Sequence, residues 1–159
     1  MIEKFTFFWQ NCFSQWHMTN FSVRNIPYNC AEQFMMAEKA RLFGDKEIEE
    51  KIMNSSDPKE QQDLGRQVKN FNQEKWNKHA RDIVYEGNYY RFNHNEYLKN
   101  LLFETVGTTL VETSPYDKIW GIGLRKNDPR VQDRTTWRGK NWLGEVLTKV
   151  RDDLIEELT

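Results

Sequence analysis

Two opposite charges stand where a helix would otherwise be apolar. The pattern from Cys30 to Phe43 predicts a helix. At about 100° per residue, Glu32 and Lys39 fall within roughly 20° of the centre of its apolar face. An unpaired buried charge is costly, so both groups must be paired, hydrogen-bonded or lining a wet cleft. A carboxylate for proton transfer and an amine whose pKa falls on burial would both serve a hydrolase.

A structural interpretation of the same two residues competes with this one. Asn29 followed by Glu32 resembles a capping box, and Lys39 could extend along an apolar surface to reach solvent. Glu38 and Arg41 fall on the opposite side of the helix, where solvent is expected. The cleft interpretation instead predicts that Glu32 and Lys39 face one pocket.

The loop 114–124 holds a tryptophan beside two glycines. Gly121 and Gly123 would let the backbone approach a ligand closely, while Trp120 offers a stacking face. The alternative is an ordinary tight turn around a buried indole. Asp117, in the same loop, is a further candidate catalytic carboxylate, and it could equally cap a turn.

Further candidate binding groups lie near both ends of the sequence. Lys140 precedes the last predicted helix, where free backbone amides would suit a phosphate. The alternative there is a cap at Asn141 with solvated cations nearby. Trp9 and Trp16 belong to an aromatic and polar cluster, in which Trp16 could stack on a base.

Composition limits the classes of function. The chain has 159 residues and a net charge of -1, which predicts one domain over residues 1–159 and excludes bulk attraction to nucleic acid or membranes. Any anionic ligand must be bound locally. Two cysteines and three dispersed histidines lack metal-ligand spacing, so we expect no metal and no cofactor. Without a secretory signal or an apolar run of about 18 residues, we expect a cytoplasmic protein with no membrane partner.

The elements needed to position these groups are mostly helical. Two strands, 5–9 and 21–24, are expected to pair, with a loop between them. A third strand is expected at 108–112, followed by a loop over 115–141. Helices are predicted at 30–43, 45–52, 57–65, 73–86, 95–102 and 143–158. The predicted fold class is α+β, a compact, mostly helical single domain with a small β-sheet.

Several motifs in order resemble the NADAR family, the YbiA-like N-glycosidases. The match covers about residues 5–151, nearly the whole chain. The motifs are Phe8-Trp9, Phe13 to Trp16, Ala31 to Ala40, Leu64-Gly65-Arg66, Ile119 to Leu124, and Trp137 to Gly144. The resemblance implies a mostly helical α+β domain that cleaves N-glycosidic bonds. Its implied substrates are phosphoribosyl-amine intermediates of riboflavin synthesis or ADP-ribosylated guanine bases.

The resemblance also implies roles for individual residues. Glu32 matches the family's essential glutamate, and Lys39 matches a lysine of the same helix that we expect to act in catalysis, as a charge or as a nucleophile. The tryptophans Trp9, Trp16 and Trp120 would line the sugar and base pocket, with Asn141 in a neighbouring motif. Arg66 and Lys140 are the candidates for binding phosphate. Position 91 holds Arg where related sequences commonly have Lys, so any role there is open.

Two functional hypotheses follow. The first is an N-glycosidase that acts on an ADP-ribosyl or phosphoribosyl adduct, with ADP-ribosylated DNA among the candidate partners. The second is a non-catalytic module that binds ADP-ribose or a related nucleotide. The presence of both Glu32 and Lys39 favours the enzyme.

Overall fold

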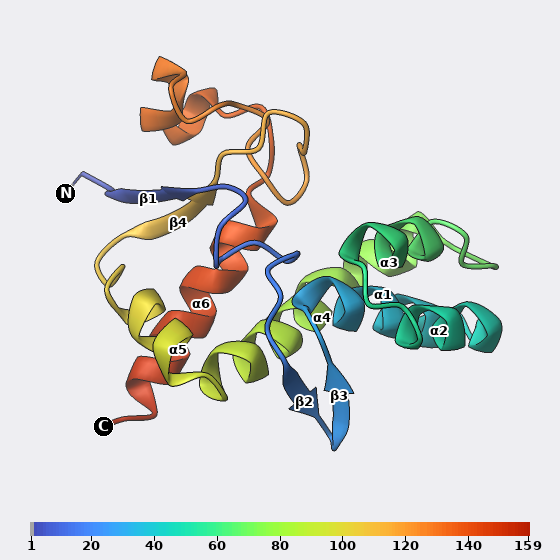
Figure 1. Cartoon of the computed structure of the whole chain (residues 1–159). Helices are drawn as coiled ribbons and strands as arrows, with labels where there is room; N and C mark the ends of the chain where they lie inside the picture. The colour runs from blue at the N-terminus through green and yellow to red at the C-terminus, as the bar shows by residue number, and fades with distance from the viewer. Residues whose placement is uncertain (1) are drawn as a thin grey trace. The chain divides into compact units, whose positions relative to one another are not determined.

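The computed structural model describes residues 2–159 and is drawn in Figure 1. These residues form six α-helices, two short 3-10 helices and four strands, which pair into two separate two-stranded sheets. The α+β, mostly helical class is therefore confirmed. The chain divides into two compact units. The terminal unit holds the chain up to Ser14 together with Glu96–Thr159, and the central unit holds Gln15–Asn95.

The central unit begins with a β-hairpin. Strands β2 (Phe21–Val23) and β3 (Ile26–Tyr28) are antiparallel, and Phe21 lies opposite Tyr28. The two-residue turn between them places Arg24 and Asn25 at positive φ, 51° and 67°, which is the geometry that a type I′ hairpin turn requires. The expected pairing of 21–24 with 5–9 is wrong. A strand over 26–28 was not expected because Pro27 lowers strand propensity.

Four helices complete the central unit: α1 (Ala31–Leu42), α2 (Lys46–Met53), α3 (Pro58–Gly65) and α4 (Gln73–Asn93). Helix α1 packs against each of the other three. Side-chain oxygens of Asp45, Asp57 and Asn72 accept hydrogen bonds from backbone amides at the starts of α2, α3 and α4. These local caps explain why the predicted starts agree with the structure.

Helix α4 extends seven residues beyond its predicted end at 86. Its Gly87 is buried, and a Cβ there would lie 2.5 Å from Cδ1 of Phe34 in α1. The glycine therefore permits close packing of two helices and does not end one. Helix α1 is itself buried on all sides over residues 31–37. In its second half Glu38 and Arg41 are only partly exposed, with 17% and 24% of their side chains accessible, so the expected solvent face at these residues is wrong.

The terminal unit is built on a parallel strand pair. Strand β1 (Phe5–Phe8) pairs with β4 (Thr109–Glu112), with Phe5 opposite Thr109 and Phe8 opposite Glu112. Helices α5 (Glu96–Phe103) and α6 (Trp142–Glu156) belong to the same unit, and α6 packs against β4. A small core of Val111, Ile122, Leu124 and Val131 is covered by Phe5, Phe7 and Trp137.

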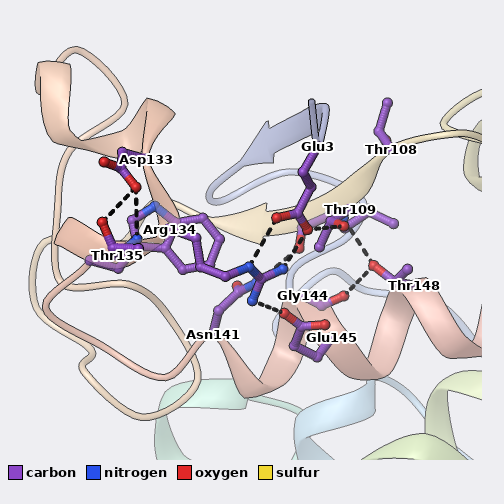
Figure 2. Close-up of polar contacts among 12 residues, drawn as sticks. Glu3, Thr108, Thr109, Asp133, Arg134, Thr135, Asn141, Gly144, Glu145 and Thr148 are labelled. Carbon is purple, nitrogen blue, oxygen red and sulfur yellow. Dashed lines mark hydrogen bonds and ion pairs between the residues drawn. The ribbon is translucent and has the colours of Figure 1, made fainter. Parts of the chain in front are cut away.

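The long loop before α6 is fastened by ion pairs. It contains the 3-10 helices η1 (Pro129–Gln132) and η2 (Arg134–Thr136). Figure 2 shows the Arg134 guanidinium between two carboxylates, Glu3 before β1 and Glu145 in α6. The contacts measure 3.0 Å from Nε to Glu3 Oε1 and 2.7 Å from Nη1 to Glu145 Oε1. Hydrogen bonding to Arg134 also lowers the pKa of Glu3.

Candidate active site

Glu32 lies at the buried start of α1. Only 2% of the residue is exposed, and its backbone amide donates to the Gln15 carbonyl at 2.9 Å. The expected capping box is wrong, because the N-cap is Cys30 and no side chain caps the helix there. Gln33 takes a related role, since its Oε1 accepts the Asn29 amide at 2.8 Å. The Glu32 carboxylate is therefore not used as a helix cap.

Lys39 lies two turns further along α1, close to two aromatic rings. Its Nζ lies 4.7 Å from the ring centroid of Phe71 and 5.6 Å from that of Trp76. Burial lowers the pKa of Lys39, the Glu32 carboxylate opposes that shift, and the Arg66 cation adds to it. The charges of Glu32 and Arg66 thus both act on Lys39 within the central unit.

Arg66 follows the C-terminus of α3. Its side chain is 68% exposed and makes a 3.8 Å ion pair with Asp63. The preceding Gly65 is buried directly against the Met36 side chain of α1, in space that a Cβ would occupy. This close contact holds the end of α3, and with it Arg66, against α1.

A buried polar chain runs beside Glu32. Asn88 Nδ2 donates to Gln15 Oε1 at 2.7 Å, and Asn88 Oδ1 accepts from Arg91 Nε at 3.1 Å and Nη2 at 3.0 Å. Arg91 is fully buried. Both Glu32 and Arg91 act electrostatically on the Cys30 thiol, whose pKa burial raises to about 11. Charges of both signs therefore meet at the start of α1.

The sequence patterns did not single out Asn88, and they left the role of Arg91 open. The two residues are three residues apart on one helical face, but the predicted helix ended at 86, so their spacing carried no meaning. The signal that could have found them is the Tyr89, Tyr90 and Phe92 side chains, which continue the aromatic character of α4 past Gly87.

The loop around Trp120 lies in the terminal unit. Trp120 is half-buried, and its ring meets Trp142 edge-on with centroids 5.5 Å apart. Asp117 Oδ1 accepts from the backbone amides of Ile119 at 2.9 Å and Trp120 at 2.8 Å. The turn-capping alternative for Asp117 therefore describes its contacts, and its catalytic role stays a prediction.

The two glycines of this loop are explained by the loop's own packing and backbone conformation. A Cβ on Gly121 would lie 2.9 Å from Glu112 Oε2, and Gly123 has a φ of +69°. A side chain would therefore be crowded at Gly121 and strained at Gly123. Their expected approach to a ligand stays a prediction.

Asn141 and Lys140 precede α6. Asn141 is fully buried in the left-handed conformation. Its Oδ1 accepts the Glu112 amide at 3.0 Å and its Nδ2 donates to the Leu110 carbonyl at 3.0 Å, so it fastens β4 to α6. The alternative of a side-chain cap at Asn141 is wrong, because its amide group is hydrogen-bonded to the strand. Lys140 is exposed, with Nζ 5.3 Å from the Trp142 ring.

The remaining tryptophans of the predicted site belong to different units. Trp9, in the terminal unit, is 37% exposed and lies beside Tyr116, and Trp16, in the central unit, is 40% exposed. Within residues 2–159 no three His, Cys, Asp or Glu side chains gather as a metal-ligand set. No helix in that range is both long enough and apolar enough to cross a bilayer.

Comparison with known proteins identifies the family. The NADAR domain family matches residues 7–155. This chain belongs to the NADAR family. The resemblance found in the motifs is thereby confirmed. This NADAR chain is 47% identical over 146 residues to "N-glycosidase R617" of Acanthamoeba polyphaga mimivirus. Those residues make up 89% of this chain and 86% of the relative.

Two further comparisons define how far the likeness reaches. "Protein irg-1" of Caenorhabditis elegans is 43% identical over 131 residues, which make up 81% of the NADAR chain but only 62% of irg-1. The NMR structure of the Escherichia coli protein YbiA has the same fold, with a TM-score of 0.79 at 24% identity, and covers 99% of this chain and 89% of YbiA.

Proposed function

We propose that this NADAR protein is an N-glycosidase whose chemistry centres on Glu32 and Lys39. One observation carries the proposal: a carboxylate that is 2% exposed acts electrostatically on an amine of the same helix whose pKa burial has lowered. Two relatives support it by name. These are the mimivirus protein and "N-glycosidase Npun_R5314" of Nostoc punctiforme, which is 26% identical over 148 residues, 92% of this chain and 88% of the relative.

Cleavage of an N-glycosidic bond defines what the site must supply. The bond between the anomeric carbon and nitrogen breaks, its electron pair leaves with the nitrogen, and that nitrogen takes a proton from solvent. Positive charge develops on the sugar ring and is stabilised by the Glu32 carboxylate. A water molecule then adds to the anomeric carbon and gives a proton to Glu32, which releases it to solvent and returns to the carboxylate. The products are the free sugar hemiacetal and the released amine or base.

Lys39 has two roles open to it in this scheme. As an ammonium it would hold the ribose or a phosphate of the substrate. As a neutral amine it would add to the anomeric carbon of the ring-opened adduct and expel the original amine or base, so that an imine forms, which water later hydrolyses to the sugar aldehyde and the free lysine amine. Burial favours the neutral amine because it lowers the Lys39 pKa.

The substrate carries an ADP-ribosyl or phosphoribosyl group. The family resemblance supports an ADP-ribosylated guanine, in a nucleotide or in DNA. A more distant relative, "Riboflavin biosynthesis protein PYRR, chloroplastic" of Arabidopsis thaliana, is 28% identical over 131 residues and supports a phosphoribosyl-amine. Those residues make up 80% of this chain but only 20% of that relative.

The test measures sugar release from both adducts by mass spectrometry. We expect one adduct to be hydrolysed, and Glu32→Gln to lower turnover by at least about 100-fold with the fold intact. Glu38→Gln is the matched control, since it makes the same change on the same helix, where Glu38 pairs with Arg24 at 2.8 Å. Tight binding of ADP-ribose without release from either adduct would instead support the non-catalytic module.

A further inference from the structure

The loop before α6 concentrates positive charge that the chain as a whole lacks. Residues 115–141 hold seven basic and three acidic side chains, although the net charge of the protein is -1. All of them lie in the terminal unit. A local field of one sign can bind an anion even when the total charge cannot.

The three carboxylates of this loop are already engaged. Asp117 and Asp133 accept backbone amides at the turns that follow them. Asp128 binds the Arg130 guanidinium at 3.0 and 2.7 Å, which lowers the Asp128 pKa to about 2. Arg134 likewise forms ion pairs with Glu3 and Glu145. Several cations of the loop therefore form no ion pair with these acids, although Arg138 also acts electrostatically on Asp128.

Three of those cations line two adjoining pockets. A pocket of about 440 Å³, the aromatic pocket, is lined by Arg125 and Lys126 with Phe7, Phe8, Trp9 and Asn127 among its walls. A second pocket of about 350 Å³, the arginine pocket, is lined by Arg125, Arg130 and Arg138, with Asn127 and the Asp128 carboxylate that pairs with Arg130 among its walls. The two pockets adjoin, because Arg125 and Asn127 line both of them. Arg125, Lys126 and Arg138 are exposed, and none forms an ion pair with any carboxylate in residues 2–159.

An aromatic face stands beside these cations. Trp9 lines the aromatic pocket, and its ring centroid lies 6.1 Å from that of Tyr116, which is 78% exposed. In proteins that bind single-stranded nucleic acid, aromatic side chains stack on the bases and cationic side chains contact the backbone phosphates. A duplex would not offer free base faces to the two rings.

We propose that the aromatic and arginine pockets together bind single-stranded nucleic acid. A base stacks at Trp9 and Tyr116, and successive phosphates contact Lys126, Arg125 and Arg138. Cations in both of the neighbouring pockets favour a strand with several phosphates over a mononucleotide. The site does not depend on the proposed glycosidase activity, because none of its residues is assigned to that chemistry except Trp9, which the sequence also placed in substrate binding.

The test is fluorescence anisotropy of a labelled, unmodified oligothymidylate of about ten nucleotides, titrated with the full-length protein over a range of salt. Affinity should fall as salt rises. Arg125→Ala with Arg138→Ala should weaken binding at low salt by roughly tenfold or more and flatten the slope of log K against log salt by about 1.4, at about 0.7 per phosphate contact. Lys46→Ala with Lys69→Ala removes the same charge from exposed positions of the central unit. This control should change neither the affinity at low salt nor the slope of log K against log salt.

The stacking half of the proposal has its own variant. Tyr116→Ala removes an exposed ring, so the fold should survive, and affinity should fall between about fivefold and a hundredfold with an unchanged salt slope. Glu32→Gln should bind the strand as the wild type does, which separates this site from the catalytic proposal. Absence of binding, equal losses in both double variants, equal binding of a hairpin duplex, or displacement of the strand by equimolar ADP or polyglutamate would overturn the proposal.

Discussion

At the scale of single residues, the state of the Lys39 amine decides between the two catalytic roles. Its pKa lies below the ordinary lysine value of about 10.4 because the side chain is buried. A nucleophilic amine gains activity as pH rises through its pKa, so turnover should rise with a midpoint below that value. A purely electrostatic ammonium would lose activity over the same range.

We expect Lys39→Arg to lower turnover by at least about 100-fold, because guanidinium keeps the charge but stays protonated. Borohydride added during turnover should reduce an imine to a stable amine and increase the mass of the peptide that contains Lys39. A Lys39→Arg protein with full activity and no trapped adduct would assign Lys39 the charge role. Lys75→Arg, on an exposed lysine of the same unit, is the control.

Trp120 poses a second question at this scale, since its ring already packs on Trp142. If its free face stacks on the substrate, Trp120→Ala should weaken ADP-ribose binding by roughly 10- to 100-fold in calorimetric titration. The variant must be shown to be folded, because removal of a core tryptophan alone costs about 3–5 kcal/mol. A folded variant with unchanged affinity would make the ring structural.

At the scale of elements, α4 presents Asn88 to Gln15 and Arg91 at once. Asn88→Ala leaves a buried guanidinium short of an acceptor, so we expect urea unfolding to show a loss of about 1–3 kcal/mol. Asn77→Ala, on the same helix but bonded only to the exposed Gln73, should cost less than about 0.5 kcal/mol. Equal stability of the two variants would contradict a role for the polar chain in holding Arg91.

The elements also separate what a sequence can reveal from what it cannot. Helix starts at Asp45 and Asp57 were predictable because a cap and its amides are neighbours in the chain. The parallel pairing of Phe5 with Thr109 was not, since it joins residues far apart and no turn signals it. The continuation of α4 past residue 86 could not be predicted either, because the glycine at 87 is explained by the Phe34 ring of another helix. The full burial of Asn88 and Arg91 beyond that point could not be predicted for the same reason.

At the scale of the whole molecule, the terminal unit includes both ends of the described chain and encloses the central unit in sequence. The single domain expected over residues 1–159 would unfold in one step. Scanning calorimetry should then give a van't Hoff enthalpy equal to the calorimetric one. Two resolved transitions would show instead that the central unit is a domain in its own right.

A further whole-molecule prediction concerns metal dependence. Glycosidic cleavage by Glu32 and Lys39 has no step that needs a divalent ion, and the residue types carry no visible ligand set. Dialysis against a chelator should leave turnover unchanged. Activity that is lost on chelation and restored by one particular metal would contradict the proposed chemistry.

The strand pair of the terminal unit has a consequence during synthesis. Strand β1 carries three phenylalanines in four residues, and its only strand partner in residues 2–159 is β4, about 100 residues later. At about 5–20 residues per second, a ribosome needs roughly 5–20 s to deliver that partner. For this interval the nascent chain exposes an aromatic segment that lacks its strand partner, and such segments are prone to aggregate until they pair.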